Sequence, residues 1–202
     1  MADTGPPHFI PFAEPANLVR DWPALSEDVA DAVAAGLDAA GGLVAVKSAI
    51  FTGTQTASVT AGNNLSVNDL TITHALADAS NKLIISAFLG AAGNGDDFST
   101  GAVGIAVHDG TGLIAIGNAD GSRTRVTAGG RTETTANPAV VSMPSVTFVH
   151  TPNTTDSKTY TVRAINISTV SNTLFINRYE SDTDNASRPR AVSSLVIQEV
   201  KV

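Results

Sequence analysis

The stretch TYTVRAINI, residues 159–167, decides the fold class because its side chains alternate in character along the chain. In an extended strand Tyr160 and Val162 would share one face, while Thr161 and Arg163 would take the other. β-Branched and aromatic residues also favour the extended conformation. The stretch therefore predicts a β-strand with one buried face.

Similar runs fill the chain from residue 43 onward, separated by turns rich in Gly, Asn and Asp. Short strands at this spacing are typical of a two-sheet sandwich, so we expect a mainly β jelly-roll head domain over residues 43–202. The last strand is more uniformly apolar, as in a strand that is buried on both sides, which favours a subunit interface there. The predicted strands cover residues 43–51, 54–60, 65–74, 82–89, 102–107, 113–116, 123–127, 140–149, 158–167, 173–177 and 193–202.

Composition excludes several classes of protein. Aromatic residues make up 5% and charged residues 15% of the chain, which suits strands with polar outer faces better than long amphipathic helices. The net charge of −7 argues against nucleic-acid binding, which needs a concentrated basic surface. The absence of Cys excludes disulfides and thiolate metal sites. Without a signal-peptide pattern or a long apolar run, we expect cytoplasmic synthesis and no membrane insertion.

A helix is predicted for residues 26–40, before the first strand. Ser26 suits the N-cap, acidic residues fill the first turn, and two glycines follow the last turn. A helix of about four turns is marginal in water, so its apolar stripe must be covered. The cover is either the downstream domain or copies of the helix in a short bundle. We favour the bundle and interpret residues 25–42 as a helical neck, with core positions Leu25, Val29, Val33 and Leu37.

Residues 1–24 form a proline-rich segment that also carries large apolar side chains. The prolines favour an extended backbone, and a merely flexible tail would not need such side chains. The segment either folds back onto its own domain or docks on a neighbouring subunit or larger assembly. We favour a docking arm, whose contact residues are Phe9, Ile10, Phe12 and Trp22.

The sequence contains no recognisable catalytic motif. The Gly-X-Ser-X-Gly pattern is absent, and His74 and His150 each end a predicted strand, where a structural role is expected. Acidic residues at 96–97 and 182–184 offer oxygen ligands for Ca²⁺ but lack the EF-hand spacing, so we predict neither a bound metal nor a cofactor. A glycan depolymerase would need paired carboxylates in an aromatic-lined cleft, and the chain has one Trp and two Tyr. We therefore expect no enzymatic activity.

Two arginines follow a turn in the predicted strand 123–127. Arg123 and Arg125 would project from the same face of that strand, where a guanidinium pair could bind a carboxylate or an anionic sugar. Alternatively, they could pair with acidic residues of neighbouring subunits. We favour this intersubunit role.

Residues 182–189 form a predicted surface loop between the last two strands. Loops that are held by a rigid sandwich commonly carry recognition. The cationic and aromatic residues that flank or end this loop are our preferred receptor contacts, namely Arg178, Tyr179, Arg188 and Arg190.

Taken in order, these segments resemble a family of small trimeric tail-fibre, tail-tip or head-fibre proteins of tailed bacteriophages, often described as minor tail or receptor-binding proteins. The similarity runs along nearly the whole chain, although each motif is short. The motifs are PANL (15–18), LSEDVADAV (25–33), LTITH (70–74), ASNKLII (79–85), IGNADGSRTR (116–125), PNTT (152–155), TYTV (159–162), FINR (175–178) and SSLVIQEV (193–200).

The resemblance implies a homotrimer of jelly-roll heads on a helical neck, similar in outline to complement-like or tumour-necrosis-factor-like trimers. The arm would bind another virion protein, and the head would face a glycan or protein on the host surface. The implied location is the virion, and tail tip, baseplate, side fibre and capsid vertex all stay open. The leading function is a tail-fibre or tail-tip adhesin. The alternative is a capsid-decoration or head-fibre protein, with a glycan depolymerase as the third class.

Overall fold

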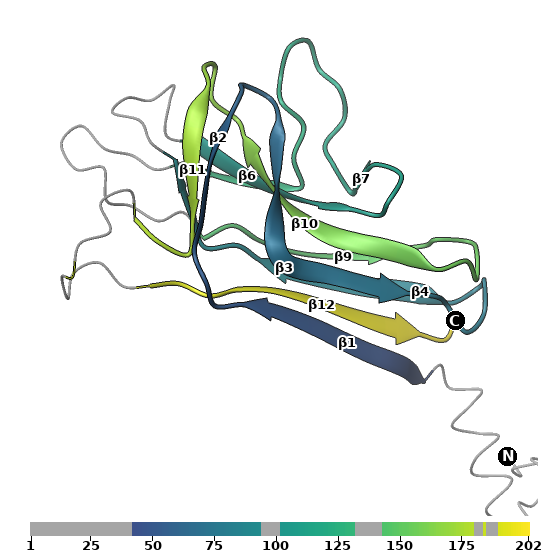
Figure 1. Ribbon diagram of the computed structural model, residues 1–202. Helices are drawn as coiled ribbons and strands as arrows, with labels where there is room; N and C mark the ends of the chain where they lie inside the picture. Colours follow the sequence, from purple (N-terminus) through teal and green to yellow (C-terminus); the bar gives the residue numbers. More distant parts are fainter. Residues whose placement is uncertain (1–41, 94–101, 132–142, 180–183, 185–189) are drawn as a thin grey trace, which may run out of the picture. The chain divides into compact units, whose positions relative to one another are not determined.

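The β domain holds all the regular structure of the described residues in a computed structural model of the chain (Figure 1). Within the described residues the regular elements are strands, and they contain no helix. The arm at residues 1–24 and most of the predicted neck, up to residue 41, lie outside the described residues. The structure describes residues 42–93, 102–131, 143–179, 184 and 190–202.

Most strands lie where alternation of apolar and polar residues predicts them. The strands are β1 (Leu43–Phe51), β2 (Gln55–Val59), β3 (Asn64–His74), β4 (Lys82–Phe88), β5 (Ala91–Gly93), β6 (Ala102–His108), β7 (Leu113–Ile114), β8 (Ala128–Arg131), β9 (Ser145–His150), β10 (Lys158–Asn166), β11 (Asn172–Ile176) and β12 (Ser193–Val200).

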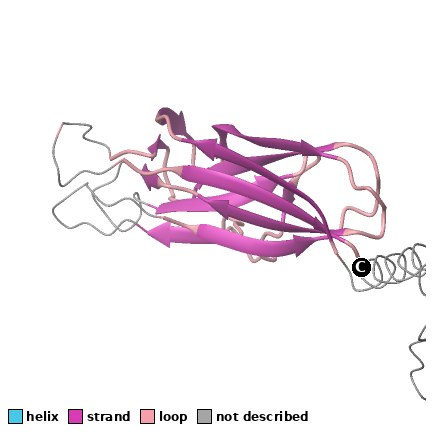
Figure 2. Cartoon of the chain, turned by 90° about the horizontal axis from the view of Figure 1, so that it is seen from below, coloured by secondary structure: helices cyan, strands magenta, loops and turns pink. Residues whose placement is uncertain are grey.

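The strands form three antiparallel sheets. The four-stranded sheet has the order β1-β12-β4-β9, and the five-stranded sheet has the order β3-β10-β6-β7 with β8 also paired to β6. A small third sheet has the order β2-β11-β5. Strands β1 and β12 both pack against β3, so the two larger sheets face each other across one core. Figure 2 shows the strands running along this sandwich, with the described loops gathered at its ends.

The core lies between the two larger sheets and is apolar through its middle. Alternate residues of each strand point into it, as period-two patterning requires. On the usual scale, each large aliphatic side chain contributes about 1.5–3 kcal/mol when it is withdrawn from water. The central residues include Leu70, Ile72, Leu83, Ile85, Ile105, Val107, Val162, Leu195 and Ile197.

The described residues cover only one side of strand β12. Leu195, Ile197 and Glu199 are buried, whereas Val196 and Gln198 between them are half-exposed. The described residues cover one side of this strand, so its burial on both sides at a subunit interface stays a prediction. An apolar run fills one face of a strand, but a second face is covered only if another layer lies over it.

Two short segments differ from the predicted strands. Residues 123–127 form a loop rather than a strand, because Gly117 N donates to Val126 O at 3.2 Å and holds the segment in a local fold. The ladder to β6 begins only at Ala128. Strand β5 has no β-branched or aromatic residue in its Ala-Ala-Gly sequence, and it exists because the edge of β11 pairs with it.

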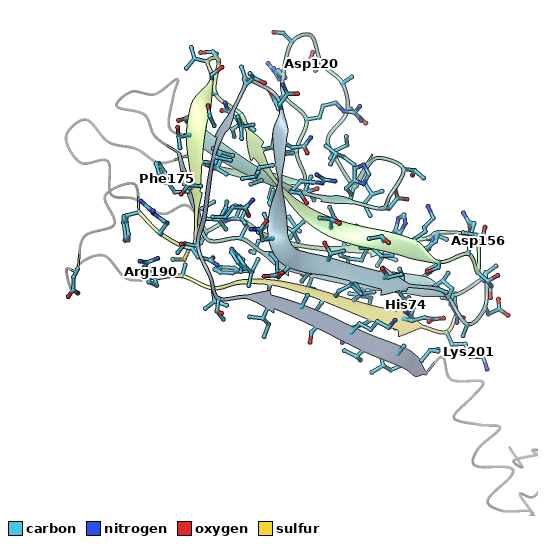
Figure 3. The ribbon with its side chains drawn as sticks, in the orientation of Figure 1. His74, Asp120, Asp156, Phe175, Arg190 and Lys201 are labelled. Carbon is cyan, nitrogen blue, oxygen red and sulfur yellow. The ribbon has the colours of Figure 1, made fainter. Side chains whose placement is uncertain are left out.

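We name the two ends of the β domain by the two ends of β12. At the entry end, Leu43 begins β1 opposite Val200. At the far end, Phe51 closes β1 opposite Ser193. Figure 3 shows His74 and Lys201 toward the entry end, with Phe175 and Arg190 toward the far end. Residues 43–202 form one compact unit.

Candidate recognition site at the far end

The structure brings three of the four predicted receptor contacts together. Arg178 and Tyr179 lie shortly after β11, which ends at Ile176. Arg190 lies shortly before β12, which begins at Ser193. The backbone N–H of Ala191 donates to the carbonyl oxygen of Asn177 at 3.2 Å, which joins these two segments. Arg188 lies outside the described residues.

Asn177 organises this end of the sandwich. Its side chain is fully buried and its φ is 58°, a left-handed conformation that Asn adopts more readily than most residues. The amide nitrogen donates to the carbonyl oxygens of Phe51 at 2.7 Å and Gly53 at 2.9 Å. The amide oxygen accepts from the Ser193 hydroxyl at 2.7 Å. All three polar contacts of the side chain thus link segments that are distant in the sequence.

The backbone of Gly90 completes this arrangement, which we call the Asn177 hub. Asn177 N donates to Gly90 O at 2.7 Å, and Gly90 N donates to the Ser193 hydroxyl at 3.0 Å. A β-carbon on Gly90 would lie 2.6 Å from the β-carbon of Ala191, so the close approach requires glycine. The hub fixes the ends of β1, β4, β11 and β12 relative to one another.

The hub holds Arg178 in a defined position. Its Nε donates to the carbonyl oxygen of Tyr179 at 3.0 Å, and its guanidinium carbon lies 5.2 Å from the centre of the Phe175 ring. Such a cation–π contact orients the planar guanidinium. Tyr179 is half-exposed and Arg190 is exposed. The accessible side chains of Arg178, Tyr179 and Arg190 offer guanidinium and phenol groups, which suit a carboxylate-bearing or hydroxyl-rich partner.

Sequence reasoning found the flanking arginines but missed the residue that positions them. Nothing local marks Asn177 as a buried hub, because its partners are separated from it by up to 126 residues. The available signal was an Asn directly after an apolar strand, where a left-handed turn is common.

Arg123 and Arg125 do not project together from a strand. Arg123 pairs with Asp120 at 2.9 Å, and both side chains are largely exposed. Arg125 Nε donates to the carbonyl oxygen of Gly117 at 2.7 Å. Each arginine thus has a partner in its own loop, and the intersubunit and anion-binding roles stay predictions.

The entry end is closed by buried polar groups that sequence reasoning also missed. Glu199 Oε1 accepts from Ala77 N at 2.8 Å and from the Asn81 amide at 2.6 Å, and Oε2 lies 2.8 Å from His74 Nε2. Burial would raise the pKa of Glu199, but the bonds from Asn81, Ala77 and His74 outweigh it and lower the pKa. The sequence signal for this site was Glu199, the one acidic residue in the otherwise uncharged stretch 193–200.

A second buried carboxylate lies at the same end. Asp109 Oδ2 accepts from Lys158 Nζ at 2.7 Å, and Oδ1 accepts from Thr111 and from Gly112 N. Burial would raise the pKa of Asp109, but these bonds hold that pKa well below its usual range. His150 lies edge-to-face on Tyr160, with 5.9 Å between ring centres. The partners of Asp109 are thus groups of the domain itself, which is the arrangement of a structural polar site.

Stability is expected to fall on both sides of neutral pH. Burial lowers the pKa of His150, and the pKa values of Glu199 and Asp109 are lowered as described, so below about pH 6.5 the unfolded chain binds more protons than the folded chain. Burial raises the pKa of Tyr160 to about 12, so stability is lost between pH 10 and 12. Denaturant unfolding at a series of pH values measures both effects.

Two conservative variants check this pH dependence. Glu199→Gln should flatten the loss of stability below pH 4.5, and Tyr160→Phe should remove the loss above pH 10. An acid loss of the same size in Glu199→Gln would show that Glu199 does not contribute to it.

Among the described residues, no group of three or more His, Asp or Glu side chains could hold a metal ion. The paired acids at 96–97, and residue 182, lie outside the described residues. No helix in the described part of the chain is long and apolar enough to cross a membrane. No protein-family model matches the chain, and a search of curated proteins found no matching relative.

Proposed function

We propose that this chain is a structural protein of a bacteriophage virion and serves as a trimeric adhesin of the tail fibre or tail tip. Residues 1–24 would dock on another virion protein, residues 25–42 would form the trimeric neck, and the β domain would face a glycan or protein on the host surface. The resemblance of the ordered sequence motifs supports the family. The arrangement of the β domain supports attachment at one end and recognition at the other.

The observation that carries the proposal is the separation of chain entry from the candidate recognition site. The chain enters the β domain at Leu43, beside Val200. Arg178, Tyr179 and Arg190 lie at the opposite end of β12, where the Asn177 hub holds them. If residues 1–42 anchor the entry end of the β domain, the far end stays free to contact a partner. The rigid sandwich holds the loops at that end in a fixed geometry.

The jelly-roll connection is part of the proposal and is supported by the strand orders. In the four-stranded sheet, β12 lies between β1 and β4, and in the five-stranded sheet β10 lies between β3 and β6. In a jelly roll, which contains two Greek keys, strands from the end of the chain lie between strands from its beginning. Viral capsid and lectin domains use this architecture, so the fold agrees with the proposal by analogy.

Labelling of intact particles tests where the protein works. We expect antibodies raised against residues 43–202 to bind at the tail. Labelling over the capsid would instead favour the decoration protein, and particles without label would refute a virion role.

Removal of the far-end side chains tests adhesion. Virions that carry Tyr179→Ala together with Arg190→Ala should adsorb to host cells at least tenfold more weakly, because the aromatic and cationic contacts are lost. Lys201→Ala at the entry end is the control and should adsorb normally. Unchanged adsorption of the double variant, in particles with normal protein content, would refute this recognition site.

A further inference from the structure

The outward side of the four-stranded sheet is uncovered by the described residues and carries almost no charge. We call this side the outer face. The strand pairings align its side chains in rows, for example Val46, Gln198, Ile84 and Val149. Its apolar members are Leu43, Val46, Ile50, Ile84, Phe88, Val149, Val196 and Val200, its neutral polar members are Ser48, Ser86, Ser145, Thr147, Ser194 and Gln198, and its one charged member is Lys82.

Large aliphatic groups on this face are strongly exposed. The exposed fraction is 53% for Val46 and 61% for both Ile50 and Val149. Val46 and Ile50 lie on β1 and Val149 lies on β9, the two edge strands of the sheet. Apolar exposure that spans a whole sheet marks an interaction surface more often than scattered single residues do.

The five-stranded sheet is different because the chain covers part of its outward side. Val126, from the loop at residues 116–127, lies so close to Gly104 of β6 that an added β-carbon would meet its Cγ1 at 2.5 Å. The outer face of the four-stranded sheet has no comparable covering segment among the described residues.

We infer that the outer face is buried against further copies of this chain. This inference rests on the proposed homotrimer and names the surface through which its β domains meet. Charge is the first reason for choosing a second copy as the occupant. The chain has a net charge of −7, so an interface between copies must avoid acidic residues. The only acid in these four strands, Glu199, points into the core.

The point of chain entry is the second reason. Residues 1–42 lead directly into Leu43, which lies on the outer face opposite Val200 at the start of an edge strand. Association of the predicted necks would therefore bring the β1 strands of several copies together. In a closed ring the three outer faces would turn toward the common axis.

The size of the face agrees with this role. Four strands spaced about 4.8 Å apart span about 19 Å, and eight residues at about 3.3 Å each extend about 26 Å. The projected area is therefore roughly 500 Å², and the accessible area of protruding side chains is larger. This is the order of the roughly 800 Å² that each partner buries in a standard interface.

Charge insertion on the outer face tests the inference. Val149→Glu in the full chain should raise the dissociation constant for self-association at least 100-fold, because an unpaired carboxylate would be buried in an apolar interface. Val170→Glu is the matched control, since Val170 is 47% exposed and lies in the turn between β10 and β11. Light scattering measures the mass of each protein relative to the 20.6 kDa chain.

The outcomes separate the inference from the proposed function. An associated parent chain, with Val149→Glu shifted to one chain mass and Val170→Glu unchanged, supports the inference. An associated parent chain whose mass Val149→Glu leaves unchanged overturns it and leaves the homotrimer standing. A parent chain of one chain mass at all concentrations overturns both.

Thiol labelling identifies a different occupant. The chain has no Cys, so Ser48→Cys on β1 and Ser66→Cys on β3 give matched single thiols at exposed serines. Slower alkylation of Ser48→Cys in the associated state alone supports the inference. Slow alkylation in a protein of one chain mass would show that another part of the same chain covers the face, and would overturn it.

Discussion

Replacement of Asn177 by alanine is expected to lower the free energy of unfolding by about 4 kcal/mol. The variant loses three buried side-chain hydrogen bonds, at about 1 kcal/mol each. It also places an alanine at a φ of 58°, at a further cost of about 1 kcal/mol. For a domain of this size the midpoint of thermal unfolding should fall by about 10 °C.

Two further variants separate the causes of this effect. Asn177→Gly keeps the left-handed backbone without strain and should recover part of the loss. Arg178→Ala changes the next residue, whose side chain lies outside the hub, and should cost about 1 kcal/mol or less. Guanidinium unfolding measures all three. A loss below about 1 kcal/mol for Asn177→Ala would show that the Asn177 hub does not hold the far end together.

The Asn177 hub also connects stability with the proposed recognition. Its bonds hold the segments that carry Arg178, Tyr179 and Arg190, so a weakened hub should let these side chains lose their common geometry. Virions with Asn177→Ala should therefore adsorb poorly even at temperatures where the β domain stays folded. Normal adsorption by such virions would show that recognition does not depend on this geometry.

Replacement of Glu199 by alanine is expected to cost about 3–5 kcal/mol at neutral pH. The change removes the acceptor of three donors, from His74, Asn81 and Ala77. Removing one member of a buried polar set is costly because the others stay buried without partners. The β3–β4 connection, which carries Ala77 and Asn81, should open most readily, and hydrogen exchange of the Ala77 amide reports this directly.

The neighbouring residue provides the control for this prediction. Gln198 lies on the outer face of the same strand, and Gln198→Ala should change the free energy of unfolding by about 0.5 kcal/mol or less. Glu199→Gln retains one acceptor oxygen and should fall between the two. Equal stability of Glu199→Ala and Gln198→Ala would contradict a structural role for the buried carboxylate.

Several features of the fold were predictable because they depend on neighbouring residues. Strands β1, β4 and β10 lie where alternation placed them, since a period of two is visible within a few residues. Residues 123–127 alternate equally well but form a loop, because Gly117 and Val126 bond to each other. Alternation thus identifies residues able to form a strand, whereas a strand also needs a free partner edge.

The candidate site was predictable only in part. Arg178, Tyr179 and Arg190 were expected from their place beside a long loop. Asn177 was not expected, because its contacts with Phe51 and Gly53 come from the opposite end of the β domain's sequence. Local composition cannot indicate which distant carbonyl groups a buried amide will meet.

By itself the sequence determined the mainly β class, the approximate strand positions, the acidic net charge and the absence of thiols, since these follow from composition and short-range pattern. Only the tertiary structure decided that Glu199 points inward and that Val46, Ile84 and Val149 share one face, which the described residues leave uncovered. The reason is register: four strands from distant parts of the chain align their side chains in rows across that face, and a shift of one residue would turn every side chain of a strand to the other side.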